Sequence, residues 1–280
     1  MVEIGKVNKL RVVKEVDFGI YLDGGEEFDE ILMPKRYVPA GTKPEDMIDC
    51  FIYLDSEDRI IATTQKPLAM VGEFACLKVV SIAPMGAFLD WGLMKDLLVP
   101  NNEQNKKMEV DNFYVVYVYL DEESNRIVAS AKVEEFLDND PHEYKEGDEV
   151  NLMICAKTDL GYKAIINESH SGVIYSNEVF KKVEIGDKLK GYIKKLRPDG
   201  KIDLRLDKPG IARVIDLATQ ITDKLKEHDG FIPVGDNSPA EEIYNTFGVS
   251  KKTFKRAIGG LYKARMITLE ENGIRLVTKK

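Results

Sequence analysis

The sequence predicts a multidomain, mainly β protein, with three tandem β-barrels of the OB-fold type followed by a C-terminal α+β domain of the winged-helix type. One reason is a repeat: segment 18–23 (Phe-Gly-Ile-Tyr-Leu-Asp) recurs 67 positions later as 85–90 (Met-Gly-Ala-Phe-Leu-Asp), with a looser third copy in 146–208. The other is a change to helical patterning after Pro209 and Gly210. A glycine-aromatic strand that recurs in this way is typical of small β-barrels. The predicted domains are residues 1–66, 67–134, 146–208 and 210–280.

Each copy of the repeat contains five strand-like segments, the number that an OB-fold barrel requires. In the first two copies, a turn rich in Asp, Ser, Glu or Asn joins the last two segments, which indicates a hairpin because these side chains bond to the turn backbone. The expected strands are 10–16, 19–23, 30–33, 49–54 and 59–63 in the first copy, 75–82, 86–90, 96–99, 113–120 and 126–130 in the second, and 151–156, 161–167, 172–175, 189–196 and 201–206 in the third.

The last expected strand of the third copy, 201–206, alternates strictly between charged residues and Ile or Leu. A period of two indicates a half-buried strand whose outer face carries a ladder of charges. Between the second and third copies, residues 134–145 are acidic and contain Pro141. This segment is expected to be a linker.

Helical signals begin after the third copy. Residues 211–226 carry apolar side chains at the spacing of an amphipathic helix. A second helix is expected to begin at Ser238, which has the chemistry of an N-cap, with Pro239 at the first helical position. Ser250 is expected to cap a third helix that runs to about Met266.

Helix, glycine-containing turn and helix form the helix-turn-helix pattern. Two strand-like segments follow, 266–269 and 274–277, and a turn containing Gly273 joins them. This hairpin corresponds to the wing of a winged-helix domain. The C-terminal region, 210–280, is therefore predicted to be a winged helix.

Length and composition exclude several classes of protein. The 280 residues exceed one ordinary core, so several small domains are expected. The sequence shows no leader-like N-terminal segment and no run of about 18 apolar residues, so a cytoplasmic protein without a membrane partner is expected. Cys50, Cys76 and Cys155 lie in apolar strand-like segments, which predicts buried thiols rather than a disulfide framework or a zinc site.

The net charge of −8 is divided unevenly along the chain. Residues 1–145 carry 16 Lys and Arg against 28 Asp and Glu, residues 146–209 carry 12 against 11, and residues 210–280 carry 12 against 9. Because Lys and Arg supply the sequence-independent part of affinity for nucleic acids, phosphate is expected to meet the C-terminal half. An acidic surface without any partner gives the same numbers.

Rings on the second strand of the repeat are candidates for stacking nucleobases. Phe18 and Tyr21 flank the glycine in the first copy, Phe88 follows it in the second, and Trp91 comes shortly after. Stacking requires a rigid π-face near solvent, and rings on a strand supply one. Rings that only fill barrel cores are the alternative.

The segment 14–22 closely resembles the strand signature of the S1 RNA-binding domain, which reads approximately aromatic, Gly, Ala, Phe, Val. In that family two aromatic residues, a histidine on the next strand, and an Asp and an Arg around the final turn form the RNA-contact face. The resemblance therefore implies three S1-like barrels, with contact positions at Phe18, Tyr21, Asp55 and Arg59 in the first copy, at Met85, Phe88, Asp121 and Arg126 in the second, and at Leu160, Tyr162 or Lys163, Tyr175, Arg197 and Lys201 in the third.

Several of these positions depart from the S1 pattern. The histidine position falls near Pro34 and Pro100 in the first two copies, and Met85 and Leu160 each replace a ring. In the third copy, Tyr175 stands near positive charge at Arg197 and Lys201. The third copy is therefore the one expected to bind RNA.

The order of parts, three such repeats followed by a winged helix, is similar to that of the bacterial conserved virulence factor B family. The resemblance covers essentially the whole chain. It implies an RNA-binding protein that influences the expression of other genes, with single-stranded RNA as the partner of the third barrel and winged helix.

The third expected helix adds a basic surface to the winged helix. Lys251, Lys252, Lys255 and Arg256 lie near its start, and Arg275 lies on the wing. A helix of this kind can meet phosphates or enter a major groove, whereas the same residues on a purely solvated helix would do neither. The alternatives to RNA binding are a DNA-binding transcription regulator and a protein-interaction scaffold, and protein partners cannot be named from the sequence.

The sequence gives little support for an enzyme. Its three histidines are isolated, and no metalloprotease, paired-cysteine, phosphate-loop or nucleophile-elbow motif is present. Asp199, Asp203 and Asp207 could be considered as magnesium ligands of a nuclease, but Lys201 and Arg205 alternate with them. No catalytic residue, metal or cofactor is therefore expected.

Overall fold

The structure is a computed structural model that describes residues 1–138, 143–176, 179, 182–207 and 210–277. The chain forms two compact units. The first comprises Met1–Tyr144, Val150–Lys190 and Lys195–Leu204, and the second comprises Lys145–Glu149, Gly191–Lys194 and Arg205–Lys280.

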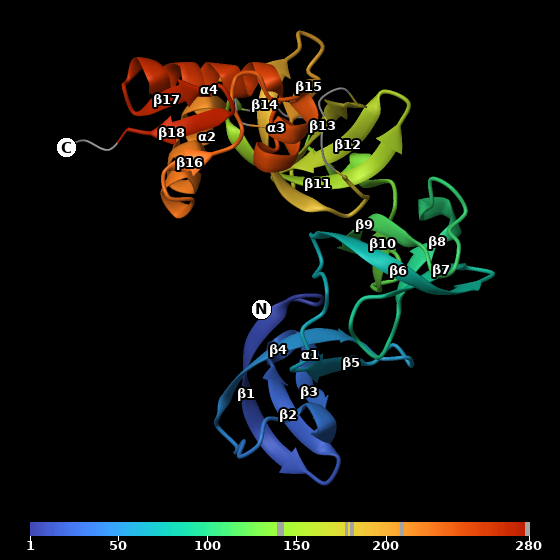
Figure 1. Cartoon of the computed structure of the whole chain (residues 1–280). Helices are drawn as coiled ribbons and strands as arrows, with labels where there is room; N and C mark the ends of the chain where they lie inside the picture. The colour runs from blue at the N-terminus through green and yellow to red at the C-terminus, as the bar shows by residue number, and fades with distance from the viewer. Residues whose placement is uncertain (139–142, 177–178, 180–181, 208–209, 278–280) are drawn as a thin grey trace. The chain divides into compact units, whose positions relative to one another are not determined.

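Three closed barrels, each of five strands, follow one another along the chain (Figure 1), which confirms the predicted fold class. The first consists of β1 (Val7–Val16), β2 (Gly19–Gly24), β3 (Asp29–Pro34), β4 (Met47–Leu54) and β5 (Ile60–Thr63). The second consists of β6 (Phe74–Ala83), β7 (Gly86–Asp90), β8 (Leu97–Pro100), β9 (Phe113–Leu120) and β10 (Ile127–Ser130). The third consists of β11 (Glu149–Thr158), β12 (Gly161–Ile166), β13 (His170–Tyr175), β14 (Lys188–Leu196) and β15 (Ile202–Arg205). In each barrel the third strand runs parallel to the fifth, and this pairing closes the sheet.

The glycine of the repeated motif lies where the second strand passes closest to the third. A Cβ atom on Gly19, Gly86 or Gly161 would collide with the backbone carbonyl oxygen of Met33, Val99 or Ile174, respectively. Backbone atoms cannot yield in the way that a flexible side chain can, so only glycine fits these positions. The motif that marks the repeat in the sequence is therefore a packing requirement of the barrel.

Apolar clusters join neighbouring barrels of the first unit. Phe51, Tyr53 and Ile61 of the first barrel are buried in one cluster with Trp91 and Leu97 of the second. Phe74 and Val115 of the second barrel share another cluster with Met153 and Ile165 of the third. Because burial of apolar surface is the main favourable term in packing, these clusters bind the barrels to one another.

Among the described residues, four short helical segments were not expected from the sequence. They are α1 (Gly25–Phe28), η1 (Lys35–Tyr37), η2 (Asn101–Glu103) and η3 (Val133–Phe136). The last corrects the predicted linker 134–145, whose first residues form a turn because Val133 and Leu137 are buried in the apolar cluster between the second and third barrels. Pro141 lies outside the described residues.

The C-terminal domain is the predicted winged helix. Its elements are α2 (Gly210–Glu227), β16 (Phe231–Ile232), α3 (Ala240–Phe247), α4 (Lys251–Lys263), β17 (Ile267–Glu270) and β18 (Gly273–Leu276), and the strand order is β16-β18-β17. Ser250 caps α4 as predicted, because its side chain accepts a hydrogen bond from the backbone N–H of Thr253 at 3.3 Å. Apolar side chains of α2, α4 and the sheet, among them Ile221, Phe254 and Ile274, form its core.

The predicted start of α3 at Ser238 is wrong. The helix begins at Ala240, its N-cap is Pro239, and no side chain caps it. The hydroxyl of Ser238 instead accepts a hydrogen bond from the backbone N–H of Gly235 at 3.1 Å. The same hydroxyl that suits an N-cap thus closes the preceding turn.

Of the three cysteines predicted to be buried, Cys50 is buried, whereas Cys76 and Cys155 are only partly buried. Cys50 is buried in the core of the first barrel, and burial raises its pKa to about 12. Burial also raises the pKa of Cys76, and that of Cys155 to about 11. All three are free thiols that remain protonated at neutral pH. No helix among the described residues is both long and apolar enough to cross a membrane.

Replacing Gly86 by Ala is expected to destabilise the second barrel by about 1–3 kcal/mol, because the new Cβ collides with the carbonyl of Val99. Urea unfolding followed by the fluorescence of Trp91, the only tryptophan, measures this. The control is Gly260→Ala in α4, where a Cβ meets nothing within 4 Å. That substitution should stabilise α4 by roughly 0.5–1 kcal/mol. An unchanged midpoint for Gly86→Ala would contradict the packing argument.

Candidate nucleic-acid interface

Strand register defines equivalent positions on the outer face of the three barrels. Tyr21 pairs with Leu32 on the third strand, Phe88 pairs with Leu98, and Lys163 pairs with Val173. Each pair lies two positions from the pairing of the motif glycine. The sequence alone did not decide whether Tyr162 or Lys163 is the counterpart of Tyr21 and Phe88. The register shows that it is Lys163. By the same register Tyr175 takes the place of Pro34 and Pro100.

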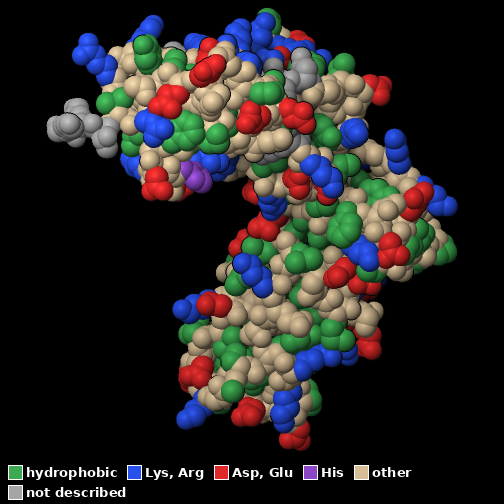
Figure 2. All heavy atoms as spheres, in the orientation of Figure 1, with side chains coloured by type: hydrophobic (Ala, Val, Ile, Leu, Met, Phe, Trp, Pro, Cys, Tyr) green, Lys and Arg blue, Asp and Glu red, His purple; other side chains and the backbone are tan. Residues whose placement is uncertain are grey.

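The first barrel presents two rings to solvent. Phe18 is 58% exposed at the β1–β2 turn, and Tyr21 is half-buried on β2. Their centroids lie 6.4 Å apart in an edge-to-face arrangement, and the Lys14 Nζ lies 4.7 Å from the centroid of Tyr21. Lys14 is also ion-paired with Glu30. Figure 2 shows acidic and basic side chains interspersed over this barrel.

In the final hairpin of the first barrel, an arginine is bound by carboxylates of the same hairpin. Asp55 accepts two hydrogen bonds from the guanidinium of Arg59, at 2.9 and 2.7 Å, and Glu57 lies 2.9 Å from the same group. These hydrogen bonds raise the pKa of Arg59, which keeps its charge. Two carboxylates therefore neutralise the cation expected to meet RNA, and the rings remain as the available part of this face.

Trp91 cannot serve as the stacking ring that the sequence suggested. It is 3% exposed, and its ring meets Phe51 edge to face with centroids 5.8 Å apart. Its indole N–H donates a hydrogen bond to the backbone carbonyl of Lys95 at 2.6 Å. Because both ring faces are enclosed by apolar neighbours, Trp91 belongs to the core between the first two barrels.

Phe88 is half-buried and lines a hollow of about 180 Å³ on the second barrel. Met85, Leu98 and Arg126 line the same hollow, together with Tyr53 and other residues of the first barrel. Arg126 is ion-paired with Asp58 of the first barrel, and Lys95 is paired with the same carboxylate at 3.2 Å. The predicted contact face of the second barrel is therefore partly covered by the first.

The third barrel brings a ring and a cation together. The guanidinium of Arg197 lies 5.8 Å from the ring centroid of Tyr175 and hydrogen-bonds its hydroxyl. Arg197 also pairs with Asp203 at 2.8 Å. Asp203 is 9% exposed, so the predicted charge ladder on this strand is wrong at that position. The ion pair with Arg197 offsets the cost of burying this carboxylate.

Each barrel has a cation at the same position of its final hairpin, and the cation of the third barrel has the weakest ion pairing of the three. The side chain of Lys201 is 70% exposed, and its contact with Asp199 is 3.3 Å. The equivalent Arg59 has two carboxylate partners, and Arg126 has its partner on another barrel. Lys163, on β12, is paired with the exposed Glu134, while Tyr162 beside it is half-buried. Exposed pairs of this kind are weak, so both lysines can exchange a carboxylate for a phosphate.

The winged helix exposes part of the basic face of α4. Lys251 donates a hydrogen bond to the carbonyl of Ser238 at 2.7 Å, and Lys255 pairs with Asp236 at 3.0 Å. Lys252 and Arg256 are exposed and have no ion-pair partner within the described part of the chain. They lie one helical turn apart, so they share a face. Lys and Arg side chains line the upper edge of this domain in Figure 2.

The wing does not extend this basic face. Arg275 pairs with Glu270 at 2.6 Å and lies 4.8 Å from the ring centroid of Phe231. Glu270 and Glu271 give the turn of the hairpin an acidic character. The expectation that Arg275 adds to the patch is therefore not supported by its contacts.

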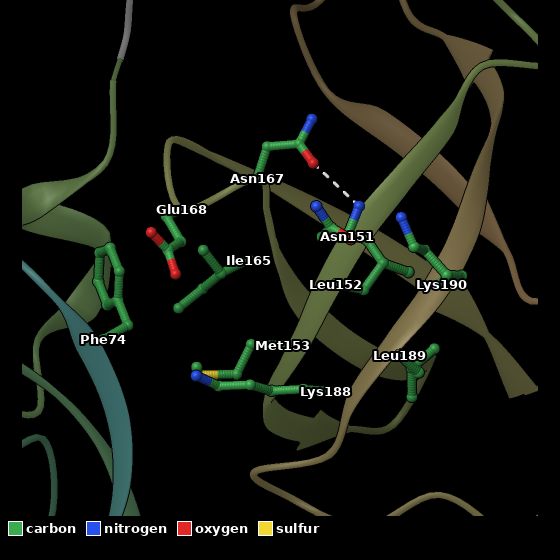
Figure 3. Close-up of a pocket in the computed structure, with 10 residues that line it drawn as sticks. All are labelled: Phe74, Asn151, Leu152, Met153, Ile165, Asn167, Glu168, Lys188, Leu189 and Lys190. Carbon is green, nitrogen blue, oxygen red and sulfur yellow. Dashed lines mark hydrogen bonds between the residues drawn. The ribbon is translucent and has the colours of Figure 1, made fainter. Parts of the chain in front are cut away.

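A second hollow, of about 700 Å³, lies in the first unit where Phe74 approaches the third barrel (Figure 3). Met153 and Ile165 form its apolar part, and Lys188 and Glu168 stand among its polar residues. None of the residues predicted to contact nucleic acid lines it. No group of three or more His, Cys, Asp or Glu side chains is placed to hold a metal ion among the residues that the structure describes.

Two family models match segments of the chain. The S1 domain model matches residues 4–65 and 71–132, and the model of the CvfB-like winged helix domain matches residues 219–276. Conserved virulence factor B of Staphylococcus epidermidis is 24% identical over 281 residues, which cover 98% of this chain and 86% of that protein. The chain therefore resembles the conserved virulence factor B family over nearly its whole length.

Another relative is the uncharacterized protein YitL of Bacillus subtilis, 27% identical over 279 residues, which cover 96% of this chain and 92% of that protein. Among solved structures, a multidomain protein with nucleic acid binding domains from Streptococcus pneumoniae is 20% identical. The match covers 98% of this chain and 98% of that chain, with a TM-score of 0.45.

Burial of Trp91 predicts weak quenching of its fluorescence by acrylamide. Because the ring is enclosed, the quenching constant should be several-fold smaller than that of the urea-unfolded chain. Phe51→Ala should raise the constant in the folded protein, since it removes the ring that covers Trp91. Equal quenching of the folded and unfolded chains would contradict the burial and return Trp91 to the list of stacking candidates.

Proposed function

We propose that this protein binds single-stranded RNA through its third barrel and winged helix and acts in the cytoplasm as a post-transcriptional regulator of gene expression. The observation that carries this proposal is the outer face of the third barrel. There Tyr175 replaces a proline of the other two copies, and Lys201 is the least engaged of the three equivalent cations. The S1 domains and the relationship to conserved virulence factor B support it.

The third barrel supplies the two parts that binding a single strand requires. A base can stack on the ring of Tyr175, whose orientation Arg197 fixes by its hydrogen bond. Lys201, and Lys163 after it exchanges Glu134 for phosphate, can hold the backbone beside the ring. Stacking accepts every base, so sequence preference is expected to be modest. No step of this binding requires a cofactor or a catalytic residue.

The winged helix contributes positive charge for phosphate contacts rather than recognition of bases. Lys252 and Arg256 present two cations on one face of α4, where phosphates are attracted without regard to sequence. The acidic turn of the wing, with Glu270 and Glu271, disfavours the second contact that a winged helix makes along a duplex. Single strands, which need no wing contact, fit this surface better.

Duplex DNA binding is the second candidate, and α4 is the observation that favours it. A capped helix with exposed cations can dock in a major groove. Fluorescence anisotropy of the full-length protein with single-stranded RNA, single-stranded DNA and duplex DNA across a salt series separates the two functions. Preference for RNA supports the proposal, preference for the duplex supports DNA regulation, and no binding to any of them leaves a protein-interaction scaffold.

The double variant Tyr175→Ala, Lys201→Ala should weaken RNA binding at least about tenfold, because it removes a stacking ring and a phosphate contact. Tyr175→Phe is the matched control: it keeps the ring and loses only the hydroxyl bonded to Arg197, so the effect should be small. Phe18→Ala should also have a small effect. Anisotropy titrations at fixed salt measure all three, and a larger loss for Phe18→Ala would place the site on the first barrel.

The double variant Lys252→Ala, Arg256→Ala should lower the slope of log K against log salt by about 1 to 2, since each phosphate contact contributes roughly one unit. The matched control is Lys226→Ala on α2, an exposed lysine already paired with Asp223. An unchanged slope in the double variant would show that α4 does not meet the backbone.

A further inference from the structure

The second barrel carries the components of a stacking face but lies against a hairpin of the first. Phe88 is half-buried between Ser81 and Leu98 on the neighbouring strands, and Met85 at the adjoining turn is 60% exposed. Arg126 stands at the edge of this face, with its side chain 53% exposed. Ring, apolar turn and cation are thus present together, as the S1 resemblance requires of a contact face.

A carboxylate from the first barrel occupies the position beside this cation. Asp58, in the β4–β5 turn, accepts hydrogen bonds from both Arg126 and Lys95, the second at 3.2 Å. Lys95 also donates to the backbone carbonyl of Asp55 in the same turn, at 2.6 Å. Hydrogen bonds from Lys95 and Arg126 lower the pKa of Asp58 and so favour its ionised form. Two cations therefore converge on one anionic group, as they would on a phosphate.

The hairpin is held by apolar packing as well as by charge. Phe51 and Tyr53, on β4, are 1% and 2% exposed in the cluster that includes Trp91. The ion pairs, in contrast, join side chains that are 35–53% exposed, and such pairs contribute little to stability. Removing the charge of Asp58 should therefore release Arg126 and Lys95 without separating the barrels.

We propose that Asp58 acts as an internal phosphate mimic that closes a second single-strand-binding face, formed by Met85, Phe88, Lys95 and Arg126. RNA must displace this carboxylate before its own phosphate reaches Arg126, and the acidic surroundings of residues 1–145 disfavour that exchange. The face is a nucleic-acid site only if the barrels bind single strands as proposed above. Binding in the unmodified chain is thereby confined to the third barrel and α4.

Asp58→Asn tests the proposal with little strain. Asp58 has a φ of 60°, in the left-handed region that Asn also tolerates, so the substitution removes the charge and preserves the turn. The control is Glu57→Gln, which makes the same change of charge at the neighbouring residue and affects Arg59 instead of Arg126. Trp91 fluorescence, unchanged in both variants, verifies that the first two barrels remain packed.

The measurement is anisotropy of labelled single-stranded RNA with the full chain carrying Tyr175→Ala and Lys201→Ala, which weaken the third barrel. Adding Asp58→Asn should restore affinity at least about fivefold relative to Glu57→Gln, and adding Arg126→Gln as well should abolish that gain. Hydroxyl-radical footprinting should then show RNA protection of Met85 in the Asp58→Asn chain only. Equal affinity of the Asp58→Asn and Glu57→Gln chains, or a gain without protection of Met85, would overturn the proposal.

The outcomes separate this proposal from the function of the third barrel. If the unmodified chain binds RNA and loses affinity through Tyr175→Ala and Lys201→Ala while Asp58→Asn has no effect, only the closed face is overturned. If the unmodified chain does not bind and Asp58→Asn does, with protection of Met85, the closed face is supported and the third-barrel site is overturned. If neither chain binds, both are overturned.

Discussion

The close passage of the second strand over the third in each barrel is the constraint on which the rest of the structure depends. At Gly19, Gly86 and Gly161 no Cβ atom fits, because a backbone carbonyl occupies its place. This fixes the register of the two strands, and register decides which side chains point outward, since a slip of one residue would reverse both faces. Tyr21, Phe88 and Lys163 therefore occupy one outer position in three barrels, whatever their chemistry.

Because the glycine secures the scaffold, the outer face is free to differ between copies. The first barrel has two rings and a cation that is already neutralised by Asp55 and Glu57. The second has a ring and a cation bound to Asp58 of its neighbour. The third has Lys163 in place of the ring at this position and has a ring two pairs further along, at Tyr175. The three copies share a fold and differ in the rings and charges of their outer faces.

The fold could be predicted from the sequence because its signals are local. The glycine motif, the period of the strands and the cap at Ser250 each act within a few residues. What could not be predicted depends on partners distant in the sequence. Trp91 resembles a stacking ring in the sequence, and only its contact with Phe51 of another barrel shows that it belongs to a core. Ser238 does not cap α3, because its hydroxyl accepts a hydrogen bond from the backbone N–H of Gly235 instead.

Contacts between residues that are distant in the sequence also explain why the net charge of the N-terminal half is a misleading guide to its surface. Residues 1–145 carry an excess of 12 acidic groups, and simple repulsion by this charge would direct RNA to another part of the chain. The contacts show a more specific arrangement, in which Asp55 and Asp58 are hydrogen-bonded to the hairpin cations of the first and second barrels. A carboxylate bound to an arginine competes with phosphate at that one site, whereas diffuse charge is screened beyond about 10 Å at moderate salt. Local pairing, more than net charge, is therefore what distinguishes the third barrel from the other two.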